Sequence, residues 1–167
     1  MDLTVIERLL ISNQFRILAK LYPEEEEYYS VQRKALENGY KLHYAEIVEN
    51  FYEEMTEQEC LEVVDILDMY RALTFSFENL KEKEGIREEE IHFDGFDGNN
   101  ETRQYLYARY FILDLDRFTE LTYGQKNPEL NSHSARLKKY RNMLAVWKLY
   151  KDKHDLSSKQ IRAILDA

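Results

Sequence analysis

The sequence has few of the residues that turn a chain sharply or cross-link it. Its 167 residues include only 5 Gly, 2 Pro and 1 Cys. Few turn residues disfavour a fold of many short strands, and one Cys cannot form a disulfide within the chain. The longest apolar run, Tyr105 to Leu113, is interrupted by Arg109 and is too short to span a bilayer. Because the N-terminus also lacks a signal-peptide pattern, we expect a cytoplasmic protein with no membrane segment.

Hydrophobic and charged residues are plentiful, but the charges are unevenly distributed. The 44% hydrophobic content is too high for a disordered chain. Residues 1–133 carry 14 basic and 29 acidic side chains, whereas residues 134–167 carry 9 basic and 3 acidic ones. Their net charges of −15 and +6 offer complementary surfaces to a second copy. Together with 13 Tyr and 8 Phe, this predicts self-association as a homodimer or higher oligomer.

The spacing of the apolar residues predicts an all-α fold, a multihelical single domain over residues 1–167. Three capping boxes, each a Ser or Thr followed three residues later by Glu or Gln, mark helix starts at Thr4, Thr56 and Ser157. Gly39 marks a helix end. About seven helices are expected, over residues 3–22, 24–38, 44–51, 57–83, 101–122, 134–151 and 158–166.

The segment 101–122 is expected to be the central helix. Apolar and aromatic residues cover nearly its whole circumference: Tyr105, Leu106, Tyr107, Tyr110, Phe111, Ile112, Leu113, Leu115 and Phe118. A helix that is apolar on all sides is usually buried. We therefore predict that the other helices pack around residues 101–122.

Three polar residues on predicted core faces are candidate site residues. Arg109 lies within the predicted central helix, where a guanidinium needs an acceptor. It is expected to hold a structural carboxylate, or else to bind a small anionic ligand. Gln14, with Asn13 beside it, falls in the apolar arc of residues 3–22. Since buried amides need partners, these two residues predict a core hydrogen-bond network or a small-molecule pocket.

Four acids, Glu46, Glu49, Glu62 and Asp65, form the sharpest catalytic pattern. Their spacing resembles the paired motifs of all-α nucleotide pyrophosphohydrolases of the MazG and dimeric dUTPase type. That resemblance implies two antiparallel helices whose carboxylates hold Mg²⁺ and a triphosphate. Helical periodicity, however, places all four opposite the apolar stripes of their helices. A solvated acidic face is therefore the favoured interpretation.

No other pattern predicts a metal, a cofactor or a nucleic-acid site. None of the four His residues has a zinc-binding spacing, and Cys60 lies on an apolar stripe as a small hydrophobe. Residues 134–151 and 158–166 resemble a helix-turn-helix, but the acidic chain opposes binding to DNA. We expect no cofactor, no metal and no nucleic-acid partner.

A series of short strings resembles the YfbU family of bacterial and archaeal proteins. The strings are Ser12-Asn13-Gln14-Phe15, Gly39-Tyr40, Asp65-Ile66-Leu67-Asp68-Met69-Tyr70, Ala72-Leu73, Phe93-x-Gly95-Phe96-Asp97, Glu101, Tyr107-x-Arg109-Tyr110, Asn142-Met143-Leu144-x-Val146-Trp147 and Leu156-Ser157 with Ile161. The resemblance covers essentially the entire chain. It implies a multihelical, self-associating domain with no established activity and no catalytic residues to carry over. In some relatives the domain is joined to a DNA-binding helix-turn-helix, which implies a ligand-sensing role there.

Two functions remain open at this point. The favoured one is a non-enzymatic helical domain that binds a partner or small ligand as a homo-oligomer. The alternative is a metal-dependent nucleotide hydrolase that uses Glu46, Glu49, Glu62 and Asp65. Carboxylates that converge within reach of one metal ion would support the enzyme.

Overall fold

The computed structural model describes residues 1–123 and 129–167, and the fold is all-α, as predicted. The α-helices are α1 (Val5–Leu21), α2 (Glu26–Asn38), α3 (Glu57–Asn79), α4 (Thr102–Arg109), α5 (Leu137–Trp147) and α6 (Ser158–Leu165). Shorter helical turns are η1 (Pro23–Glu25), η2 (Lys41–Val48), η3 (Glu88–Glu90), η4 (Tyr110–Asp114) and η5 (Thr119–Thr122). The chain forms two compact units, Met1–Glu54 and Met55–Ala167. Of the helices in the described ranges, none has the length and apolar character needed to cross a membrane.

The predicted helix starts are confirmed by side-chain caps. The Glu7 N–H donates to the Thr4 hydroxyl at 3.2 Å, and the Thr4 N–H donates to the Glu7 carboxylate at 2.7 Å. The same reciprocal arrangement opens α3 at Thr56 and α6 at Ser157. Gly39 ends α2 with a φ of 73°, a left-handed conformation that glycine adopts without strain. These boundaries follow from local chemistry, which is why the sequence predicts them.

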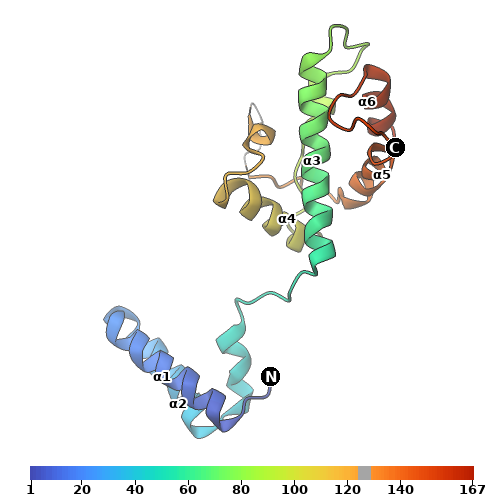
Figure 1. Ribbon diagram of the computed structural model, residues 1–167. Coiled ribbons are helices and arrows are strands. Elements are labelled where there is room, and N and C mark those ends of the chain that lie inside the picture. The colour runs from blue at the N-terminus through green and yellow to red at the C-terminus, as the bar shows by residue number, and fades with distance from the viewer. Residues whose placement is uncertain (124–128) are drawn as a thin grey trace. The chain divides into compact units, whose positions relative to one another are not determined.

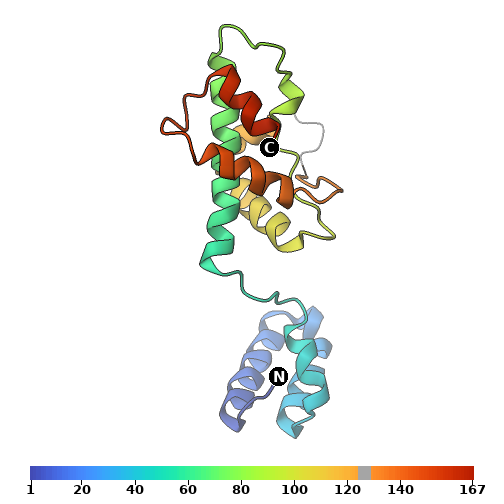
Figure 2. The same ribbon diagram turned by 90° about the vertical axis from the view of Figure 1, so that its right-hand side faces the viewer.

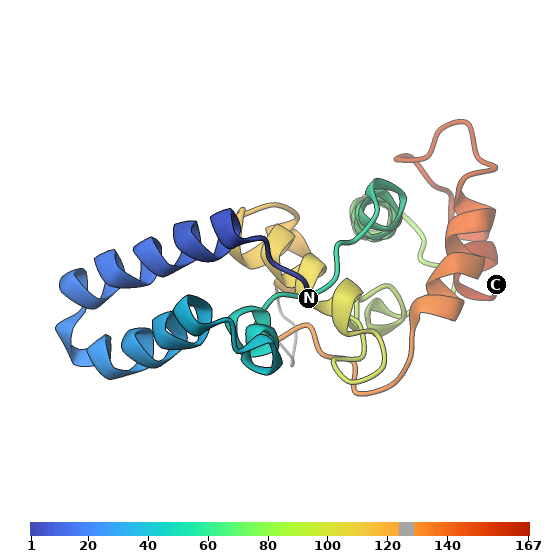
Figure 3. The same ribbon diagram turned by 90° about the horizontal axis from the view of Figure 1, so that it is seen from below.

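The first unit is a helical hairpin with few buried side chains. Figure 3 shows α1 and α2 lying side by side, joined by the short turn η1. Polar contacts join one edge of the pair, where the Ser12 hydroxyl donates to Glu37 at 3.1 Å and Arg8 donates to the Leu36 carbonyl at 3.0 Å. The helix expected over 44–51 is instead the 3₁₀ helix η2. The buried apolar side chains of this unit are Ala35, Leu36 and Tyr44.

In the second unit, α3 is the central helix (Figures 1 and 2). Helices α4, α5 and α6 each contact it. Partners cover several of its sides, so buried residues occur around much of its circumference. They are Val63, Ile66, Leu67, Met69, Tyr70, Ala72, Leu73, Ser76 and Phe77.

The prediction that residues 101–122 form the central helix is wrong. Helix α4 ends after eight residues, the π-helical turn η4 follows, and the chain then changes direction before η5. Asp116 and Phe118 have φ values of 51° and 56°, which a right-handed helix does not contain. Only Ala108 of α4 and Ile112 of η4 are buried. The apolar residues of this segment therefore do not share one helix, and several of them lie at the surface.

Candidate functional site

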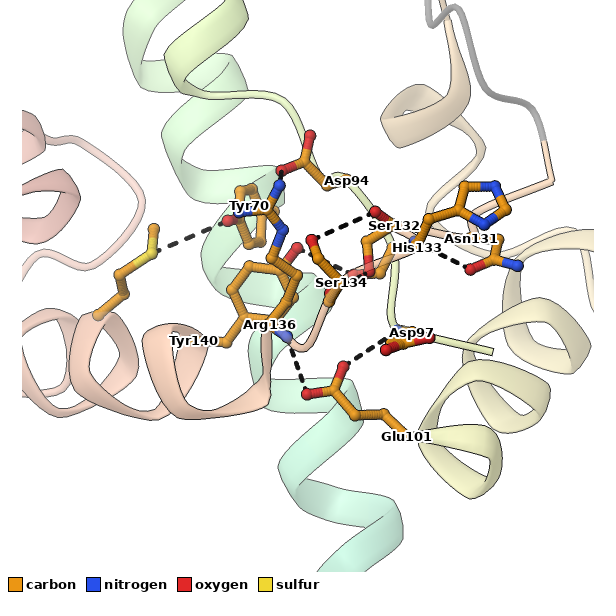
Figure 4. A network of polar contacts seen from close by, with 12 residues as sticks. Tyr70, Asp94, Asp97, Glu101, Asn131, Ser132, His133, Ser134, Arg136 and Tyr140 are labelled. Carbon is orange, nitrogen blue, oxygen red and sulfur yellow. Dashed lines mark hydrogen bonds and ion pairs between the residues drawn. The ribbon is translucent and has the colours of Figure 1, made fainter. Parts of the chain in front are cut away.

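A polar network joins the loop before α4 to the loop before α5 (Figure 4). We call it the loop network and define it by residues 93–101 and 130–137. The two loops meet at a parallel bridge, in which the Phe96 N–H donates to the Leu130 carbonyl at 3.1 Å. A Cβ atom on Gly95 would lie 1.8 Å from the same carbonyl oxygen, so only glycine permits this approach. The loops are thus held at backbone contact.

Glu101 is the buried carboxylate at the centre of the loop network. Its Oε1 accepts the backbone N–H groups of Arg136 at 2.8 Å and Leu137 at 2.7 Å, where α5 begins. Its Oε2 accepts the backbone N–H of Asp97 at 3.0 Å. The first N–H groups of a helix lack partners within the helix, and α5 has no side-chain cap at its own N-cap residue. Glu101, which precedes α4, therefore ties the start of α5 to the start of α4.

Asp97 organises the turn that leads into α4. The residue is buried, and its carboxylate accepts the side-chain amide of Asn100 and the backbone N–H of Asn99 at 3.0 Å. These hydrogen bonds, that from Asn100 above all, hold the pKa of Asp97 below its ordinary value of 3.8. Since Asp97 and Glu101 both face amide donors of the protein, they have a structural role in this arrangement.

An aromatic cluster lies beneath the loop network. Tyr70 of α3, Phe93, Phe96 and Tyr140 of α5 have neighbouring ring centroids 5.2 to 5.7 Å apart. The Tyr140 hydroxyl donates to the Gly95 carbonyl at 2.9 Å. Burial raises the pKa of both Tyr70 and Tyr140, so the two hydroxyls remain protonated at neutral pH. The cluster anchors the loop network to α3.

The sequence indicates no role for Glu101 beyond its place in the family strings. Its partner Arg136 is 35 residues away in sequence, and no local pattern connects the two. An acid just before a helix normally indicates a cap of that same helix. The only signal that could have singled it out was the resemblance, in which Glu101 follows the Phe93-x-Gly95-Phe96-Asp97 string.

The four-acid pattern is divided between the two units. Glu46 lies in the first unit, where its carboxylate is 2.9 Å from Nδ1 of His43. Glu62 of α3 receives two bonds of 2.8 Å from the Arg141 guanidinium, and Asp65 pairs with Lys148. Across residues 1–123 and 129–167, no group of three metal-ligating side chains occurs. Instead of facing solvent alone, Glu62 and Asp65 pair with cations near α5.

The basic C-terminal segment therefore finds acidic partners within its own unit. Beyond the two pairs just described, His154 lies 3.5 Å from Asp68, and the Arg162 guanidinium lies 2.9 Å from Glu90. The charge difference between the two parts of the sequence is partly satisfied inside the chain. It is thus a weaker argument for association than the sequence alone indicated.

Arg109 occupies the last turn of α4 and is half-buried. Its Nη1 donates to the Tyr105 hydroxyl at 2.7 Å, and its guanidinium carbon lies 5.4 Å from the centroid of that ring. Within the described residues its guanidinium meets no carboxylate, unlike the paired arginine that we expected. The difference follows from the early end of α4, because Arg109 is not inside a long buried helix.

Asn13 and Gln14 are exposed in the hairpin rather than buried among core side chains. They lie among exposed apolar residues of α1, on a face that reaches the edge of α2, because Val5, Leu9 and Asn13 border a hollow together with Leu36 and Glu37 of α2. We define the α1 row as the residues spaced four apart along this face, namely Val5, Leu9, Asn13, Ile17 and Leu21. Its four apolar members are 52% to 71% exposed. Ile6 and Leu10, beside the row, are equally open to solvent.

The comparison with protein families gives one match over the full chain. The family described as the YfbU domain matches residues 1–167. The matched region therefore includes the hairpin with the α1 row as well as the loop network.

Proposed function

The chain belongs to the YfbU family, and on that premise we propose that it is a non-enzymatic helical binding protein that works as a homo-oligomer. One observation carries the proposal, which is the exposed apolar face of α1. Monomeric proteins seldom leave a contiguous apolar patch of this kind uncovered, and such patches usually mark interaction sites. The hairpin is the association module in this proposal.

The small core of the first unit supports the same function. A unit of this size rarely folds without disulfides, metals or an oligomeric partner when it buries little apolar surface. Here three apolar side chains are buried, whereas large apolar side chains such as Leu42 and Phe51 are 86% and 79% exposed. Covering them with protein would supply the apolar burial that the hairpin lacks.

A protein partner is supported better than a small anionic ligand. Arg109 already donates to Tyr105, and the cations of the C-terminal segment described above have acidic partners. An anion would have to displace those contacts. We further propose a cytoplasmic location, since the single free Cys60 fits a reducing compartment.

The test is the mass of the full chain in solution. Light scattering after size exclusion, at tens of micromolar protein, should give a dimer or a higher oligomer. The apparent mass should decrease on dilution if the association is reversible. A monomeric mass at all concentrations would refute the proposed function.

A further inference from the structure

We propose that the α1 row packs antiparallel against the α1 row of a second copy, with the two Asn13 side chains meeting on a two-fold axis. This inference rests on the proposed function, because it names the partner of the same apolar face. It adds an orientation, a register and a specific role for Asn13.

The α1 row is symmetric about its own centre. Helix α1 runs from Val5 to Leu21, and Asn13 is its middle residue. An antiparallel two-fold pairing centred there places Leu9 opposite Ile17 of the second copy. Because residues four apart drift around a helix and such ridges cross at about 50°, the contact is centred on Asn13, Leu9 and Ile17, and Val5 and Leu21 lie at its edges. Rows with a spacing of four are also the ridges that most often interlock when helices pack.

Asn13 favours a second copy over an unrelated apolar helix. An amide carries both donors and an acceptor, so two Asn side chains can hydrogen-bond to each other across a two-fold axis. A wholly apolar partner would leave the amide buried without a hydrogen bond, which is unfavourable. A single polar residue within an apolar helix seam is also a known device for fixing register and oligomeric state.

The charges on α1 favour the antiparallel orientation. Glu7 lies in its first turn and Lys20 in its last turn. An antiparallel pair places Lys20 next to the acidic first turn of the second copy and aligns the helix dipoles favourably. A parallel pair would instead place the two Lys20 side chains near each other, where like charges repel.

Asn13→Asp tests the axial contact. Two carboxylates would then face each other on the axis, while the exposed position in the hairpin leaves folding unchanged. Sedimentation equilibrium at neutral pH should show a dimer dissociation constant raised at least about tenfold. The matched control is Asn50→Asp, another exposed asparagine of the same unit that lies outside α1, and it should not alter the dissociation constant.

The apolar part of the α1 row is tested with a matched pair of variants. Ile17→Glu inserts a charge into the row and should give a monomer. Leu42→Glu changes an equally exposed apolar residue outside the row and should leave the oligomer intact. Circular dichroism of each variant checks that the helices are retained.

Cysteine cross-linking tests the orientation in a Cys60→Ser background. Asn13→Cys should form a disulfide between copies under mild oxidation, because the Cβ atoms of a disulfide lie about 4 Å apart. A mixture of Leu9→Cys and Ile17→Cys chains should form the mixed disulfide. Lys34→Cys, on the exposed side of α2, should give none.

The outcomes separate this inference from the proposed function. A monomeric wild type refutes both the inference and the proposed function. This holds even if Ile17→Glu lowers the thermal midpoint of the monomer, a result that would mean that the α1 row is covered within the chain. A wild-type oligomer that dissociates in Ile17→Glu but is unaffected by Asn13→Asp refutes only the inference, whereas an oligomer unaffected by both also refutes the hairpin as the association module. Efficient disulfide formation by Ile17→Cys alone also refutes it, since that pairing requires parallel helices.

Discussion

The carboxylate of Glu101 accepts the backbone N–H of Leu137 at 2.7 Å, across 36 residues of sequence. Glu101 also immediately precedes α4, so this one side chain lies at the start of both α4 and α5, two helices that flank α3. Glu101 therefore couples the start of α4 to the start of α5.

Glu101→Gln should destabilise the fold by about 2 kcal/mol, as expected when hydrogen bonds to a buried charged acceptor are lost. In wild type both carboxylate oxygens of Glu101 accept backbone N–H groups. Glutamine keeps one acceptor oxygen, and its NH₂ group would replace the other oxygen and face an N–H donor that it cannot accept. Chemical denaturation measures the change in unfolding free energy. Glu82→Gln, at an exposed glutamate of the same unit, serves as the control and should stay within about 0.5 kcal/mol of wild type. An equally small change in Glu101→Gln would contradict the assigned role.

Arg109→Met should lower the unfolding free energy by about 1 kcal/mol, the usual value for one hydrogen bond. This is less than the loss expected for a buried ion pair, because the guanidinium is half-buried and meets a hydroxyl. Tyr105→Phe removes the same bond and should have a similar effect. The double variant should lose less than the sum of the two. A loss above about 3 kcal/mol in Arg109→Met would indicate a buried acceptor that these contacts do not include.

The Glu62–Arg141 pair should contribute a coupling free energy of about 0.5 to 1 kcal/mol, as good surface pairs do. Both partners are partly exposed, and the geometry is bidentate. A double-mutant cycle with Glu62→Gln and Arg141→Gln measures the coupling, and high salt should reduce it. Coupling that is absent at low salt would show that the pair adds nothing to stability.

Mg²⁺ should leave the thermal midpoint of the protein unchanged at millimolar concentration. Glu62 and Asp65 already face Arg141 and Lys148, and a metal ion would have to displace those cations. A ligand that binds the native state raises the midpoint, so differential scanning fluorimetry is sufficient to detect it. A rise that disappears in Glu62→Gln would support the nucleotide hydrolase instead.

Glu90 should make the second unit sensitive to acid. The Arg162 guanidinium, followed by the backbone N–H of Arg87, lowers the pKa of Glu90 from 4.5 to about 2. Because the folded pKa is the lower one, the contribution to stability is complete above pH 4.5 and is lost as the pH falls toward 2. The unfolding free energy of wild type should therefore decrease more steeply over that window than that of Glu90→Gln. Parallel curves would contradict the contact, and Glu89→Gln provides the exposed control.

What the sequence predicts correctly is what short-range chemistry determines. The caps at Thr4, Thr56 and Ser157 and the end of α2 at Gly39 depend on residues within one turn of each other. The end of the helix after α4 does not depend on such short-range contacts. The apolar spacing continues through Asp116 and Phe118 and does not predict their left-handed conformations. Phe118 is buried against the guanidinium of Arg71 in α3, a contact between residues far apart in the sequence.

The candidate site was harder to predict for two different reasons. Glu101 accepts hydrogen bonds from backbone N–H groups at the start of α5. Every residue except proline has such a group, so the residue types in the sequence do not indicate this contact. Gln14 falls in an apolar arc with Asn13 beside it, but hydrophobic periodicity cannot tell whether that arc is covered by the same chain or by another. The structure leaves it exposed.

The sparse core of the first unit has a thermodynamic consequence. If protein–protein contact covers the α1 row, the folding of the hairpin is linked to association, and its free energy varies with the logarithm of protein concentration. The second unit has its own large core and needs no such linkage. Dilution should then separate the melting of the two units, with the hairpin unfolding at a concentration-dependent temperature while α3 and its neighbours keep theirs. The fraction of folded hairpin would then depend on the concentration of the protein in the cell as well as on its sequence.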